Sequence, residues 1–217
     1  MFYEKYPDFN SDGWGWYDPE GNDANEIPAY AFGNTTWSDG KNSNLVYFSF
    51  PEKVTKIGKY AFSGTLLSGA LVIPSDVTEI GDYAFSYTDI TSLELPHHLV
   101  KIGNEAFSGC ASLGGSLSLP ESLEELGSSA FSGCRLLTGT LSIPSKISKI
   151  PSGCFGGCGF TGDLVIPEGI VEIGGSAFYG CSSLTGQLSL PKSLKKIGGS
   201  AFSYCGLQGE LVIPSEI

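Results

Sequence analysis

The chain has 217 residues, 41% hydrophobic and 16% charged, which allows a substantial buried core and argues against a disordered chain. Its formal net charge is −11, with 12 basic residues scattered among 23 acidic ones, which disfavours nucleic acid and anionic membranes as partners. No stretch approaches 18 consecutive apolar residues, so we predict no membrane span.

Residues 1–25 match no other part of the chain, and we predict an N-terminal cap or the end of a preceding module. Trp14 and Trp16 lie here in a glycine-rich stretch, and Trp37 lies further along. Aromatic side chains of this kind cover the open end of a stacked fold or, when exposed, stack on sugar rings. We expect capping, with carbohydrate binding as an alternative.

Asp8, Asn10 and Asp12 have the oxygen spacing of a calcium-binding loop, with a glycine in the sixth position. The glutamate expected at the twelfth position is replaced by Pro19, and no flanking helices are evident. We therefore predict no metal site and keep Asp8, Asn10 and Asp12 only as candidate calcium ligands.

A degenerate repeat unit is predicted over residues 26–50. The segment Ile27-Pro28-Ala29-Tyr30-Ala31-Phe32 is similar to Ile57-Gly58-Lys59-Tyr60-Ala61-Phe62 of the following unit. The longer distance from Phe32 to Pro51 indicates an insertion around residues 35–44.

Regular repeats occupy residues 51–217. A proline recurs every 22 to 24 residues, and a phenylalanine follows each of the first seven prolines after eleven. The return from phenylalanine to the next proline varies between 11 and 13 residues, so one loop absorbs every length change. We predict seven stacked units and a short stub. The phenylalanines, predicted to fill the interior, are Phe62, Phe85, Phe107, Phe131, Phe155, Phe178 and Phe202.

Two apolar residues alternate directly before each proline, as in Leu71/Ile73 and Leu117/Leu119. This spacing predicts one short parallel strand per unit, which the proline ends because it lacks a backbone N–H. The Ala-Phe segment is predicted to form a short 3₁₀ or helical turn. The expected fold is an α/β-type repeat solenoid, an arc with short parallel strands and little helix.

Each unit carries Ile-Pro, Val-x-x-Ile-Gly, Ala-Phe and Cys-x-x-Leu positions, as residues 164–184 illustrate. Over roughly residues 26–217 this pattern resembles the BspA-type leucine-rich repeats of microbial surface proteins. The resemblance implies a secreted or cell-surface protein, often bacterial, that adheres to a protein or glycoprotein on host or neighbouring cells. It implies no catalytic residue and no cofactor. Pro151 replaces the usual glycine, and Thr65 and Thr88 replace the cysteine, without threatening the fold.

Five of the six cysteines lie three residues after a repeat phenylalanine. Because Thr65 and Thr88 occupy the same slot, we predict a ladder of buried thiols rather than obligatory disulfides. Disulfides between neighbours and a metal site are the alternatives. The five residues are Cys110, Cys134, Cys158, Cys181 and Cys205.

The residues that flank each buried strand pair are expected to face solvent on the concave side of the arc. They are small and mostly polar, without a basic stripe or an acid/base pair, which favours a shallow protein-binding surface over a small-molecule pocket. The candidate ligand-binding residues are Ser92, Glu94, Ser116, Ser118, Thr140, Ser142, Asp163, Gln187 and Glu210.

We therefore predict a non-catalytic, extracellular or cell-surface leucine-rich repeat protein that mediates protein–protein interaction or adhesion. His97 and His98 are the only histidines, so neither a zinc site nor a catalytic relay can be assembled convincingly. A structural spacer that presents another module is one alternative. Carbohydrate binding through the tryptophan-rich N-terminal end is the other.

Overall fold

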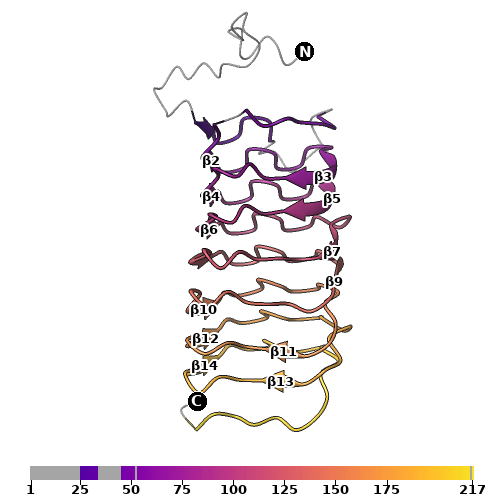
Figure 1. Ribbon diagram of the computed structural model, residues 1–217. Helices are drawn as coiled ribbons and strands as arrows, with labels where there is room; N and C mark the ends of the chain where they lie inside the picture. The colour runs from indigo at the N-terminus through magenta and orange to yellow at the C-terminus, as the bar shows by residue number, and fades with distance from the viewer. Residues whose placement is uncertain (1–24, 34–44, 52, 216) are drawn as a thin grey trace, which may run out of the picture.

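The computed structural model describes residues 25–33, 45–51, 53–215 and 217, which stack as successive coils into a column (Figure 1). Several predicted features lie outside the described residues: the N-terminal cap (apart from residue 25), the insertion around residues 35–44, the three tryptophans, and the candidate calcium ligands Asp8, Asn10 and Asp12.

Two-residue strands form a row along one side of the column, called here the regular file. In each strand a charged residue faces solvent and the aliphatic residue after it points into the interior, as in β4, where Glu79 is half-buried and Ile80 buried. The sequence analysis missed this file, because two residues are too few to show alternation. The strands are β1 (Glu26–Ile27), β2 (Lys56–Ile57), β4 (Glu79–Ile80), β6 (Lys101–Ile102), β8 (Glu125–Leu126), β10 (Lys149–Ile150), β12 (Glu172–Ile173) and β14 (Lys196–Ile197).

Neighbouring strands of the regular file pair in parallel with their equivalent residues opposite each other, such as Ile57 with Ile80. The constant spacing from proline to phenylalanine makes this register possible in coil after coil. The pairing is interrupted once among the described strands. It forms one sheet in the order β1-β2-β4-β6-β8 and a second in the order β10-β12-β14.

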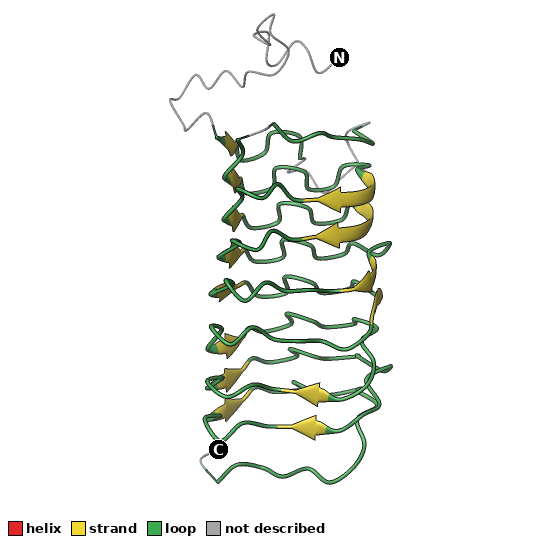
Figure 2. Cartoon of the chain, viewed as in Figure 1, coloured by secondary structure: helices red, strands yellow, loops and turns green. Residues whose placement is uncertain are grey.

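A second row of strands lies on another side of the coils (Figure 2). It forms three separate parallel pairs, β3 with β5, β7 with β9 and β11 with β13. Four of these strands overlap the predicted positions before the prolines. The strands of this row are β3 (Ser68–Val72), β5 (Asp89–Glu94), β7 (Gly114–Ser116), β9 (Leu136–Thr138), β11 (Leu164–Val165) and β13 (Leu188–Ser189).

The strands β7 and β9 end before the apolar pairs in which strands were predicted. Ser116 pairs with Thr138, 22 residues later, whereas Pro144 follows Pro120 by 24 residues. The extra residues around Gly139, which has a φ of 78°, shift the register and end the ladder. The loop of variable length therefore divides the second row of strands into separate pairs. The constant spacing from proline to phenylalanine keeps the regular file in register.

The α/β label is wrong for the described residues, which contain no helix (Figure 2). The Ala-Phe segment is a run of tight turns. Ser63 donates its N–H to the carbonyl of Tyr60 within the same coil (3.2 Å), whereas Phe62 donates to Ala84 of the next coil (2.7 Å). Alternate N–H groups thus point along the column toward the next coil. Tyr60 accordingly has a positive φ (56°), a conformation that a right-handed helix does not contain.

The phenylalanines form the centre of the core, as predicted. All but the last are fully buried, and Phe202 is half-buried. From Phe62 to Phe202, successive ring centroids lie 5.0 to 6.0 Å apart, with the rings 3° to 19° from parallel. Each ring covers its neighbour, so every coil depends on the next for burial.

Replacing Phe107 by alanine should lower the free energy of unfolding by about 3–5 kcal/mol, because both ring faces lose their contacts and a cavity remains. The matched control is Phe202→Ala, which removes a half-buried ring and should cost clearly less. Urea unfolding followed by circular dichroism measures both. Equal costs would contradict a continuous stack.

Candidate functional site

All nine predicted binding residues are exposed along the segments before the prolines, called here the pre-proline face. The alternation holds as predicted: Leu117 and Leu119 point inward, with exposed fractions of 5% and 7%, while Ser116 and Ser118 point outward. Equivalent positions in successive coils form two rows. The row four residues before each proline contains Ser92, Ser116, Thr140, Asp163, Gln187 and Glu210; the row two residues before it contains Glu94, Ser118 and Ser142.

Hydroxyl groups dominate the centre of this face, and they lack partners within the described part of the chain. No hydrogen bond is formed there by the side chains of Ser92, Ser116, Ser118, Thr140 and Ser142, whereas buried Thr88 donates to the carbonyl of Phe85 (2.8 Å). The adjoining backbone of residues 117–119 and 140–143 also forms no hydrogen bond among the described residues. Donors and acceptors are therefore available to a partner across this part of the face.

Asp163 has a structural task as well. Its Oδ1 accepts the backbone N–H of Gln187 in the next coil (2.7 Å). Asp82 holds the N–H of Asn104 in the same way (2.8 Å), on another side of the column. Asp163 thus ties two coils together, and the hydroxyl rows are the freer part of the pre-proline face.

Exposed valines border the hydroxyl rows. Val72 and Val165, with exposed fractions of 55% and 58%, occupy the row two residues before the proline, on either side of Glu94, Ser118 and Ser142. A surface of hydroxyls with apolar edges and little charge at its centre is typical of protein interfaces, whose cores are depleted of charged residues.

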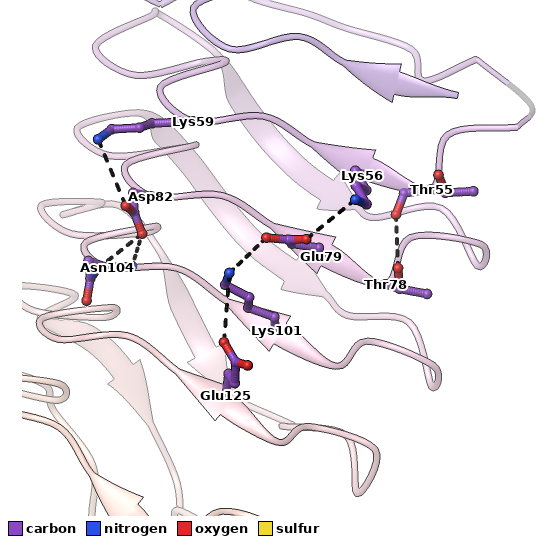
Figure 3. A network of polar contacts seen from close by, with 9 residues as sticks. All are labelled: Thr55, Lys56, Lys59, Thr78, Glu79, Asp82, Lys101, Asn104 and Glu125. Carbon is purple, nitrogen blue, oxygen red and sulfur yellow. Dashed lines mark hydrogen bonds and ion pairs between the residues drawn. The ribbon is translucent and has the colours of Figure 1, made fainter. Parts of the chain in front are cut away.

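Alternating charges follow the regular file, a feature that the sequence analysis missed. Glu79 lies between Lys56 (3.9 Å) and Lys101 (3.0 Å), and Lys101 also approaches Glu125 (3.8 Å), as Figure 3 shows. The hydrogen bond to Glu79 raises the pKa of Lys101. A signal was present, because Lys and Glu alternate six residues before each repeat phenylalanine. Each exposed pair contributes at most about 1 kcal/mol.

Three tyrosines also stack along the column, with ring centroids 5.0 Å apart between Tyr30 and Tyr60 and 4.5 Å apart between Tyr60 and Tyr83. The hydroxyl of Tyr83 donates to Glu105 (2.8 Å), and this hydrogen bond is the main cause that raises the pKa of Tyr83 to about 12. Both faces of Tyr60 are covered by its neighbours, so the centre of the row does not offer a ring face on which a sugar can stack.

Five of the six cysteines form the predicted ladder, and none of the six is joined in a disulfide among the described residues. Each thiol of the file donates to the carbonyl of a phenylalanine in the preceding coil, as Cys134 does to Phe107 (3.2 Å). Burial raises the pKa of Cys158 to about 12 and also raises that of Cys134. These thiols are therefore neutral near pH 7. Among the described residues, no group of three or more His, Cys, Asp or Glu side chains is placed to hold a metal ion.

His97 and His98 lie on an exposed turn. Within the described ranges, no helix is long and apolar enough to cross a membrane.

The model of the BspA type leucine rich repeat region matches residues 25–161 and 148–217, in six copies. The chain belongs to this family. Among functionally curated proteins, none matches it.

Solved structures of bacterial leucine-rich repeat proteins are similar to this BspA-type chain. One from Bacteroides ovatus is 28% identical over 76% of this chain and 48% of its own, with a TM-score of 0.57. A leucine-rich cell surface protein from Faecalibacterium prausnitzii is 29% identical over 74% of this chain and 53% of its own, with a TM-score of 0.52. One from T. pallidum is 26% identical over 83% of this chain and 70% of its own, with a TM-score of 0.57. The chain spans about half the length of the first two.

We expect the free energy of unfolding to fall as the pH rises above about 8.5, the pKa of an unfolded cysteine. The buried thiols keep their protons in the folded state because their pKa is raised, whereas the unfolded chain loses them, so alkaline pH favours unfolding. Urea midpoints at pH 7 and pH 9.5 measure the effect.

The control for this pH dependence is the double variant C134T/C158T, which places threonine where Thr65 and Thr88 stand in other coils. The variant should fold and show a smaller loss of stability between the two pH values. An unchanged slope would mean that these thiols do not titrate on unfolding.

Proposed function

We propose that this BspA-type chain is a non-catalytic module of a secreted or cell-surface protein, and that it binds a protein or glycoprotein partner along its pre-proline face. The supporting observation is a set of exposed hydroxyls that form no hydrogen bond among the described residues, at Ser92, Ser116, Ser118, Thr140 and Ser142. The unpaired backbone of 117–119 and 140–143 adds further donors and acceptors in the same area.

The shape of this face favours a macromolecule over a small ligand. Its residues come from stacked coils and form rows along the column, so a partner gains contacts with each coil that it covers. A protein interface needs about one hydrogen bond per 100–200 Å², which spaced hydroxyls and backbone groups can supply. Small ligands instead need a concave pocket that buries most of their surface.

Two observations support an extracellular location. One solved relative, from Faecalibacterium prausnitzii, is described as a leucine-rich cell surface protein. The buried thiols also suit an oxidising environment, because the thiolate is the species that reacts and burial raises the pKa of Cys134 and Cys158. Cys134 and Cys158 therefore need no reducing compartment to stay free of disulfides.

The test uses the fluorescently labelled chain and its adherence to intact host epithelial cells and to co-resident bacteria, measured by flow cytometry. The variant S118R/S142R places two long charged side chains in the hydroxyl rows and should reduce half-saturating binding at least about tenfold, because the close approach of a partner is lost. The control A111R/S183R adds the same charge at exposed positions outside that face and should bind like the unaltered chain.

Two other outcomes contradict the proposal, and a third narrows the identity of the partner. Equal binding by both double variants would mean that the pre-proline face does not contact the partner. Absence of saturable adherence by the unaltered chain favours a structural spacer, and loss of adherence after periodate treatment of the cells identifies the partner as a glycan.

A further inference from the structure

The regular file is interrupted between β8 and β10, where Pro151 stands in the position of a glycine. In the neighbouring coils that glycine donates its N–H to the preceding coil, as Gly127 does to Ile102 (2.8 Å) and Gly174 to Ile150 (2.7 Å). Proline has no N–H to donate. Among the described residues, no backbone hydrogen bond joins 124–127 to 148–151. We call this interruption, between residues 124–127 and 147–151, the Pro151 seam.

Steric crowding acts in the same direction. A Cβ atom at Gly127 would lie 2.3 Å from the backbone N of Asn104, so coils approach this closely only where the residue is glycine. Pro151 brings a Cβ and a ring to the equivalent place, and its coil must stand further from the preceding one.

Three further observations agree with an opening on one side of the column. The ring centroids of Phe131 and Phe155 are 6.0 Å apart, the longest step in the stack from Phe62 to Phe202. Leu126 is 9% exposed, compared with 1% for the equivalent Ile102. Figure 1 shows a wider step above β10 than between the other strands of this file. The turns that directly follow remain joined, because Ser129 donates its N–H to the carbonyl of Ser152 (2.9 Å).

A hollow of about 500 Å³ lies at the seam. Buried aliphatic side chains, Ile102, Leu126 and Ile147, line it. Its charged lining consists of three acidic residues, Asp82, Glu124 and Glu125, and two lysines, Lys101 and Lys149. The carbonyl groups of Glu124 and Leu126, which would accept N–H groups from the next coil in an unbroken ladder, have no hydrogen-bond partner among the described residues. The hollow thus combines an apolar floor with unpaired acceptors.

The charge ladder is also broken here. Glu172 is held by two lysines, Lys149 (3.2 Å) and Lys196 (2.7 Å). Within the described part of the chain, Glu125 forms an ion pair only with Lys101, at 3.8 Å, and none across the seam. Lys149, the next lysine of the ladder, also lines the hollow but pairs with Glu172. Lys146 pairs with Glu124 across the seam (2.7 Å). The side of Glu125 that faces the hollow therefore has no ion-pair partner among the described residues.

We propose that the Pro151 seam binds an arginine side chain of a partner protein. A guanidinium group carries five N–H donors in one plane, so it can pair with the carboxylate of Glu125 and donate to the carbonyls of Glu124 and Leu126 at once. Its aliphatic stem packs on Ile102, Leu126 and Ile147. Lysine fits less well, because its ammonium is a compact, strongly hydrated charge. The site lies on the regular file and is independent of the pre-proline face.

The test titrates the isotopically labelled chain with N-acetyl-arginine methylamide and follows backbone amide signals by NMR. We expect saturable shifts at Gly103, Gly127 and Ser148, which border the hollow, and weaker binding of the lysine analogue. Absence of saturable shifts at these amides, or equal binding of the lysine analogue, would overturn the proposal.

Two variants with a matched control locate the site. E125Q removes the carboxylate and should weaken binding about tenfold, whereas E26Q makes the same change in β1, far from the seam, and should bind like the unaltered chain. P151G restores the glycine and the N–H, so it should close the seam, protect the amide of residue 151 from hydrogen exchange and abolish the shifts. If the amide of residue 151 in P151G is protected from exchange and the variant still binds the arginine analogue, the seam is not the binding site. If that amide exchanges rapidly, Pro151 is not the cause of the seam.

The pre-proline variant S118R/S142R separates this proposal from the function proposed above. It should keep the arginine-induced shifts even though it loses adherence to cells. Loss of both in this variant would mean that the two surfaces are not independent and would contradict the placement of the site.

Discussion

Backbone hydrogen bonds between successive coils are the interaction on which the structure depends. No coil can bury its own apolar side chains, so each one needs a neighbour at strand-pairing distance. Along the regular file and the turns, N–H groups donate to the adjacent coil, as Gly81 does to Ile57 (2.8 Å) and Phe62 to Ala84 (2.7 Å). This pairing requires a constant number of residues in the arc and a glycine where the backbones approach most closely.

Both proposed sites lie where this pairing fails. On the pre-proline face the variable loop shifts the register, so the backbone near Ser118 and Ser142 has no hydrogen-bond partner in the part of the chain that the structure describes. On the regular file Pro151 removes one donor and forces two coils apart. In both places, polar groups that a regular solenoid would satisfy internally face solvent or a hollow. A partner that supplies the missing hydrogen bonds gains them without breaking any in the protein.

The interior has the same shape in each coil, but one of its positions accepts more than one residue type. Stacked phenylalanine rings fill its centre, and the slot three residues after each ring accepts cysteine or threonine, because both can donate to a nearby phenylalanine carbonyl. The surface varies more freely, from alternating charges on the regular file to hydroxyls and valines on the pre-proline face. Diversification of binding in such a fold needs only surface substitutions and loop lengths.

The sequence alone determined the period, the buried phenylalanines, the thiol file and the exposure of residues such as Ser118, because these follow from spacing along the chain. It did not reveal the two-residue strands, the turns in place of a helix or the consequence of Pro151. These depend on neighbouring coils: Lys56–Ile57 is a strand only beside Glu79–Ile80, the positive φ of Tyr60 accompanies an N–H directed at the next coil, and Pro151 matters through a carbonyl 25 residues earlier. Only the stacked tertiary structure brings these groups together.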